Sequence, residues 1–99
     1  MSLELDTAPA LYIRAIDTWG AESQLRQFQD ECAEAIAAVN RMIRGTGSVD
    51  SLAEEIADVE IMCEQARRVV GIHRVEHFRK LKLARLEDRL NNPSKVVTK

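Results

Sequence analysis

The chain of 99 residues has few of the residues that mark disulfide frameworks, sheets or disorder: 2 cysteines, 2 prolines, 4 glycines and 4% aromatic residues. The two cysteines, Cys32 and Cys63, are too few for a disulfide framework and lack metal-site spacing. Both are expected to be small core residues. No apolar run approaches the ~20 residues that span a bilayer, and the early acids do not fit a secretory signal. These absences predict a cytoplasmic protein with no membrane segment.

The length and composition favour one small helical domain. With 45% hydrophobic and 30% charged residues, the chain suits a packed helical fold better than disorder. We expect a single all-α domain over residues 1–99, with a core at about 8–91 and a flexible tail at 92–99. A lone helical chain of this size buries little surface, so function is expected to need a partner copy.

The net charge of -2 hides a separation of charge along the chain. Residues 29–66 contain nine acids and two bases, whereas residues 67–99 contain ten bases and three acids. An acidic middle is suited to cations and a basic end to phosphates.

Helical periodicity accounts for most of the chain, and no stretch alternates with the period of a strand. We predict helices over residues 8–17, 21–44, 51–70 and 72–91. The second is expected to end at the Gly45–Ser48 loop, and Ser51 with Glu54 has capping-box spacing at the start of the third. The second and third helices carry predicted apolar stripes, formed by Leu25, Phe28, Cys32, Ile36, Val39 and Ile43 and by Leu52, Ile56, Val59, Cys63, Ala66 and Val70.

Two pairs of acidic residues, each with a spacing of three, lie in consecutive predicted helices. Glu31 and Glu34 belong to the second helix, and Glu55 and Asp58 to the third. Residues i and i+3 lie about 60° apart, so each pair projects two carboxylates from one side of its helix. Glu55 lies only about 40° from Val59, the centre of its apolar stripe. Antiparallel packing of the two helices would bring the four carboxylates together.

Carboxylates gathered at the edge of a core repel one another unless a cation neutralises them. All-oxygen ligands select a hard ion such as Mg²⁺ or Mn²⁺, and neither pair contains the histidine or cysteine that would favour zinc. The Glu-x-x-His of ferritin-like di-iron sites is also absent. One such pair usually belongs to a solvated helix face, but two pairs on consecutive helices favour a metal site.

The spacing of these acids resembles the signature of a known family. Asp30-Glu31-x-x-Glu34, a spacer of 20 residues and Glu55-x-x-Asp58 are similar to the EExxE…ExxD signature of MazG-like, all-α nucleoside triphosphate pyrophosphohydrolases. Asp30 departs from the glutamate usual there. Phosphoribosyl-ATP pyrophosphatases share the fold, but the run at 58–62 does not match theirs.

Two further segments extend the resemblance over roughly residues 15 to 90. Trp19-Gly20 and Gln24-Leu25 precede the first acidic pair, and Lys82-x-x-Arg85-Leu86-x-x-Arg89 resembles the basic last helix of the family. The family implies a four-helix, MazG-like bundle assembled as a homodimer or homotetramer.

The resemblance also implies an activity and roles for residues. Mg²⁺, or Mn²⁺, would be bound by Glu31, Glu34, Glu55 and Asp58, with Glu34 as the catalytic carboxylate that orients or deprotonates the attacking water. A nucleoside triphosphate would be cleaved to the monophosphate and pyrophosphate. The remaining expected contacts are Lys82, Arg85 and Arg89 to phosphate, and Trp19, Gln24 and Gln27 to the base.

Other interpretations remain open at this point. Each acid or base taken singly can belong to a solvated helix face, and Trp19 is equally plausible as a core residue. The alternative function is a non-enzymatic, helical regulatory or interaction module on the same scaffold. A nucleic-acid partner is not expected, because stacking aromatics are few and the acidic middle would repel a phosphate backbone.

Overall fold

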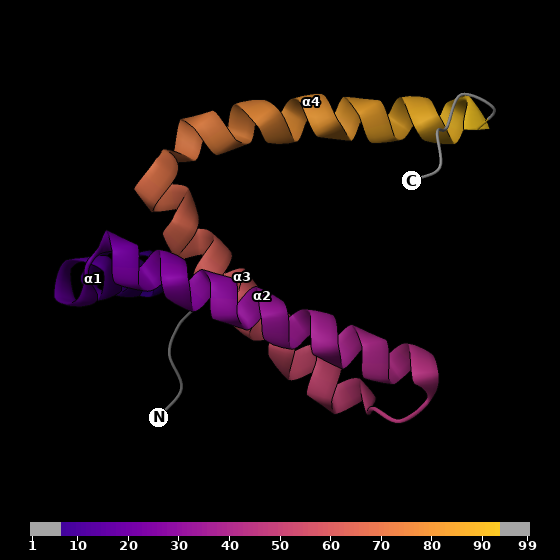
Figure 1. The fold of residues 1–99 in the computed structure, drawn as a ribbon. Coiled ribbons are helices and arrows are strands. Elements are labelled where there is room, and N and C mark those ends of the chain that lie inside the picture. The colour runs from indigo at the N-terminus through magenta and orange to yellow at the C-terminus, as the bar shows by residue number, and fades with distance from the viewer. Residues whose placement is uncertain (1–6, 94–99) are drawn as a thin grey trace. The chain divides into compact units, whose positions relative to one another are not determined.

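The computed structural model describes residues 7–93, and these form four α-helices and no strand (Figure 1). The helices are α1 (Ala8–Trp19), α2 (Ala21–Arg44), α3 (Val49–Val70) and α4 (Ile72–Asn91). The predicted all-α class is confirmed. The chain divides into two compact units, residues 1–69 and 70–99, which are described separately below. The single domain stays a prediction, and the predicted flexible tail lies outside the described residues from 94 onward.

Glycines with positive φ separate the helices where the sequence predicts breaks. Gly45 ends α2 in the left-handed conformation, with φ of 78°. Its N–H donates to the Met42 carbonyl at 3.0 Å, and the Thr46 N–H donates to the Arg41 carbonyl at 2.9 Å. This pair of bonds is a Schellman motif, which satisfies carbonyls that the helix end would leave unpaired. Gly71 has φ of 111° between α3 and α4.

Helix α3 begins two residues before the predicted start. Its cap is Ser48, whose Oγ accepts a hydrogen bond from the Ser51 N–H at 3.0 Å. Ser51 is therefore a residue inside the first turn, and the predicted capping box of Ser51 and Glu54 is wrong. A serine at the N-cap satisfies one of the unpaired N–H groups of the first turn.

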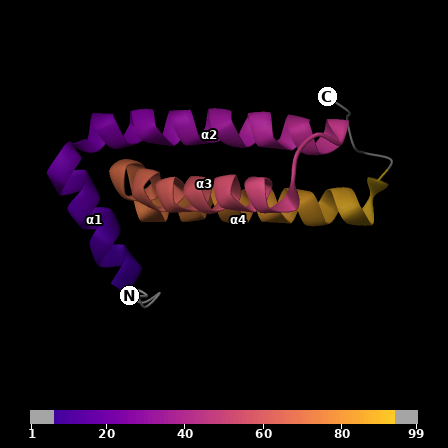
Figure 2. The same ribbon diagram turned by 90° about the horizontal axis from the view of Figure 1, so that it is seen from below.

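The first unit is built on an antiparallel pair of helices. Helices α2 and α3 lie side by side and are joined by the loop at residues 45–48 (Figures 1 and 2). Helix α1 contacts α2. It also reaches α3, where the Arg68 guanidinium lies 5.0 Å from the centre of the Tyr12 ring. This cation–π contact fixes α1 against the C-terminal part of α3.

The seam between α2 and α3 is thin and contains polar side chains. Its buried and half-buried residues recur every three or four positions, at Gln24, Phe28, Glu31, Ala35, Ala38 and Met42 on α2 and at Leu52, Glu55, Val59, Met62 and Ala66 on α3. Among the described residues, only Ala38 and Met62 are buried apolar side chains. The small alanines let the two helices approach closely, and two glutamates occupy positions that apolar residues normally fill.

The described part of the second unit is essentially α4. From His77 to Pro93 every residue is exposed, including Phe78, Leu81, Leu83, Leu86 and Leu90. The helix also carries the basic residues predicted to bind phosphate. Within residues 7–93, no helix combines the length and apolar character needed to cross a bilayer.

Candidate metal centre

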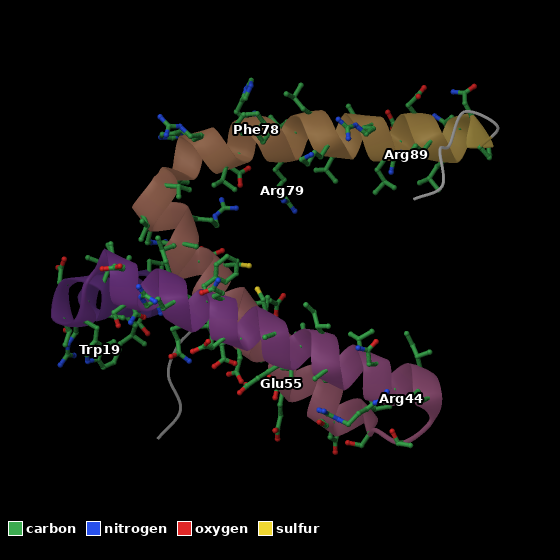
Figure 3. The ribbon with its side chains drawn as sticks, in the orientation of Figure 1. Trp19, Arg44, Glu55, Phe78, Arg79 and Arg89 are labelled. Atoms are coloured by element: carbon green, nitrogen blue, oxygen red, sulfur yellow. The ribbon has the colours of Figure 1, made fainter. Side chains whose placement is uncertain are left out.

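Three glutamates from the two helices of the seam meet at one point. Glu31 and Glu34 of α2 and Glu55 of α3 each offer one carboxylate oxygen, and these oxygens all lie within 4.8 Å of one another. Glu31 and Glu55 are half-buried, whereas Glu34 is exposed at the edge of the group. Figure 3 labels Glu55 and shows it projecting from the α2–α3 pair. We call these three residues the carboxylate cluster.

Two oxygens of the carboxylate cluster are buried without a hydrogen-bond partner, Oε2 of Glu31 and Oε2 of Glu55. Buried carboxylate oxygens are normally paired, because an unpaired one loses its water without compensation. Two such oxygens beside a third carboxylate form an all-oxygen donor set of high negative charge. That donor set fits a hard divalent cation such as Mg²⁺ or Mn²⁺.

Gln27 orients the Glu31 carboxylate. The Gln27 Nε2 donates a hydrogen bond to Glu31 Oε1 at 2.8 Å, one helical turn along α2. This bond occupies one carboxylate oxygen, and Oε2 is the one left buried and unpaired. The sequence signal for this contact is the i, i+4 spacing, which the prediction of Gln27 as a base contact did not use.

The pKa of Glu31 is raised above its usual value of 4.5. The main cause is desolvation by burial, and the nearby carboxylates of Glu34 and Asp58 raise it further. The hydrogen bond from Gln27 acts in the opposite direction by stabilising the charged form. The negative charge of Glu31 is therefore less favourable at this position than in water.

The structure brings together three of the four predicted metal ligands. Asp58 is exposed and lies outside the carboxylate cluster, although its charge still acts on Glu31. Successive residues of a helix point about 100° apart, so Asp58 lies well to the side of Val59, which accounts for this exposure. Metal binding by these four residues stays a prediction.

The residues predicted to contact the base are dispersed. Gln24 is buried in the seam, so its prediction as a base contact is not supported by this structure. Gln27 is engaged with Glu31. Trp19 is 64% exposed at the end of α1 (Figure 3). It lines a shallow pocket together with Leu11, Arg14, Ala15 and Thr18. Its alternative reading as a core residue is wrong for this chain.

Another buried amide lies on α3, next to the seam residues, and was not predicted. Gln65 of α3 is buried, and its Nε2 contacts the Met62 sulfur at 3.8 Å. Its Oε1 has no hydrogen-bond partner. The sequence offered one signal for this contact, which is the spacing of three between Gln65 and the seam residue Met62.

Lys82, Arg85 and Arg89, the predicted phosphate contacts, all lie exposed on α4 in the second unit. Their spacing keeps them within an arc of about 60° on that helix. Comparisons with models of known protein families, with curated proteins and with solved structures found no match to this chain.

Proposed function

We propose that the protein is a Mg²⁺-dependent nucleoside triphosphate pyrophosphohydrolase. The observation that carries the proposal is the carboxylate cluster, in which oxygens from Glu31, Glu34 and Glu55 lie within 4.8 Å of one another and Oε2 of Glu31 and Oε2 of Glu55 are buried and unpaired. The resemblance of the acidic pairs to the MazG-like signature supports the choice of reaction. In this proposal, the scaffold is a MazG-like bundle that acts in the cytoplasm on nucleotide pools.

Glu31, Glu34 and Glu55 would hold the ion, with Asp58 as the fourth ligand that the resemblance implies. When bound, the ion supplies charge neutralisation for a triphosphate and lowers the pKa of a coordinated water. Glu34 is exposed at the edge of the carboxylate cluster, where a solvent molecule has access. We assign to its carboxylate the role of orienting the attacking water and accepting its proton. Attack at the α-phosphorus forms the new P–O bond and expels pyrophosphate.

The basic residues of α4 would complete the neutralisation of the triphosphate. Lys82, Arg85 and Arg89 lie on one side of α4 and are all exposed to solvent. Charge-assisted hydrogen bonds from such groups to phosphate oxygens are among the strongest available to a protein. Trp19 is the remaining candidate for the base, because its exposed indole offers a stacking surface.

The exposed apolar side chains support a homo-oligomer, either a dimer or a tetramer. The same exposure favours the second candidate function, a non-enzymatic interaction module. Seventeen large hydrophobic side chains are exposed among the described residues. A monomer that exposes only single, scattered apolar side chains would show far fewer.

One experiment separates the two candidate functions and identifies the substrate class. Purified protein is incubated with canonical and modified ribo- and deoxyribonucleoside triphosphates, first with Mg²⁺ and then with EDTA, and pyrophosphate is measured. We expect release of pyrophosphate and monophosphate that requires Mg²⁺. No turnover of any nucleotide, together with no metal-induced rise in melting temperature, would contradict the enzyme and leave the interaction module.

A further inference from the structure

Arg68 of α3 connects two helices of the first unit. Its Nη1 donates hydrogen bonds to the Glu64 backbone carbonyl at 2.8 Å and to Glu64 Oε1 at 3.0 Å. The Arg68 side chain is only 17% exposed, and its guanidinium carbon lies 5.0 Å from the centre of the Tyr12 ring on α1. Glu64 therefore fixes the direction of the guanidinium, and the guanidinium holds the aromatic ring of α1. We call these three residues the α1 clamp.

Outside the α1 clamp, α1 is attached by a thin contact. None of its residues is buried, and its half-buried side chains are those of Ala8, Tyr12, Ala15 and Ile16. Tyr12 is the largest of these four. A single residue, Gly20, separates α1 from α2, with φ of 91° and no atom within 4 Å of the place that a Cβ would take. Packing around this joint therefore does not fix the orientation of α1.

Tyr12 and Trp19 lie on the same face of α1. Residues seven positions apart differ by only about 20° around a helix. A rotation of α1 that displaces Tyr12 from Arg68 therefore also turns the indole of Trp19. The indole is 64% exposed, and in the view of Figure 3 Trp19 and Glu55 project on the same side of the first unit. The α1 clamp thus sets the direction of the exposed ring that is the remaining candidate for the base.

We infer that Arg68 is a positioning residue for nucleotide binding, which acts through Tyr12 by holding α1 in the orientation that presents Trp19 to the base. The inference rests on the proposed function and adds to it a residue that touches neither the ion nor the nucleotide. A protein whose binding-competent state is only partly populated binds its ligand more weakly by that fraction. Loss of the α1 clamp is therefore expected to weaken nucleotide binding and to leave the chemical step at the carboxylate cluster unchanged.

Steady-state kinetics of Arg68→Met test this separation of binding from chemistry. KM for the nucleotide is expected to rise about 10-fold, the scale of a partly desolvated cation–π contact, with kcat within about twofold of the parent. Arg68→Lys keeps a cation and is expected to recover part of the loss. Arg26→Met is the matched control, because it also breaks an ion pair one helical turn long, at 3.2 Å to Glu22, but at a side chain that is 73% exposed. Equal effects of Arg68→Met and Arg26→Met, or a fall in kcat at unchanged KM, would overturn the inference.

Substitutions of Tyr12 test the same contact from α1 and keep the inference falsifiable if Arg68→Met is poorly folded. Tyr12→Phe retains the ring and is expected to have the parental KM, whereas Tyr12→Leu is expected to match Arg68→Met. The double variant of Tyr12→Leu with Arg68→Met is expected to be no worse than either single variant, because both remove one contact. Circular dichroism checks that each variant keeps its helices. Additive increases in KM would overturn the inference.

The fluorescence of Trp19 reports the orientation of α1 without a nucleotide, because Trp19 is the only tryptophan in the chain. Its anisotropy is expected to fall in Arg68→Met and in Tyr12→Leu, and to keep the parental value in Arg26→Met and Tyr12→Phe. Equal anisotropy in all five proteins would overturn the inference. Absence of turnover by the parent would contradict the proposed function, whereas an active parent with an unchanged KM in Arg68→Met would contradict the inference alone.

Discussion

Glu55→Gln is expected to lower the Mg²⁺-dependent release of pyrophosphate about 100-fold or more. Glu55 is the contribution of α3 to the carboxylate cluster, and its Oε2 is buried without a partner. The substitution keeps the shape of the side chain but removes its charge and one ligand oxygen. Loss of residues that merely support a metal ligand already costs about 10–100-fold, so loss of a ligand costs at least as much. Initial rates at saturating nucleotide and varied Mg²⁺ measure the effect.

The neighbouring residue provides the matched control. Glu54 has the same charge and lies in the same turn of α3, but it is exposed and outside the carboxylate cluster. Glu54→Gln is expected to retain the parental rate and Mg²⁺ dependence. Equal losses in the two variants would indicate a general effect of negative charge on α3, and equal retention would remove Glu55 from the mechanism.

Glu31→Leu is expected to raise the melting temperature of the metal-free protein by several degrees at pH 7. Glu31 occupies a seam position, and burial raises its pKa above 4.5, so its charged form is unfavourable in the folded chain. An apolar side chain removes that cost and adds apolar contact within the seam. The same substitution is expected to abolish any rise in melting temperature on adding Mg²⁺.

The rise in melting temperature caused by Glu31→Leu is expected to depend on pH in a definite direction. A carboxyl whose folded pKa is raised contributes relative stability below its unfolded pKa and loses it as the pH rises through the folded pKa. The parent is therefore expected to lose stability relative to Glu31→Leu as the pH rises above about 4.5. Melting curves of Glu31→Gln measure the part of the stability change that comes from removing the charge, without the added apolar contact. A gain that is unchanged between pH 4 and pH 7 would show that the charge of Glu31 has no part in it.

The positions of the helices were predictable because local chemistry determines them. Helices at 21–44 and 72–91 were predicted with the bounds that the structure gives to α2 and α4. Gly45 and Gly71 adopt positive φ at the predicted breaks, a conformation that is difficult for other residues. The start of α3 was misplaced because Ser48 and Ser51 both have the chemistry of a cap, and only the geometry distinguishes them.

The seam was harder to predict than the helices. Periodicity identified the apolar stripe of α2, but much of that stripe is exposed, and alanines with Glu31 face α3 instead. A hydrophobic pattern shows which side of a helix avoids water and does not distinguish a contact within the chain from one between chains. Prediction of Glu55 at the edge of the apolar stripe succeeded because α3 does turn Val59 towards the seam.

Direct binding of Mn²⁺ is the measurement closest to the central claim, that the carboxylate cluster holds a divalent cation. Electron paramagnetic resonance follows free Mn²⁺ during titration of the parent, of Glu54→Gln and of the double variant Glu31→Gln with Glu55→Gln. We predict saturable binding to the parent and to Glu54→Gln, and its loss in the folded double variant. Equal binding by all three proteins, or no saturable binding by the parent at millimolar Mn²⁺, would contradict the claim.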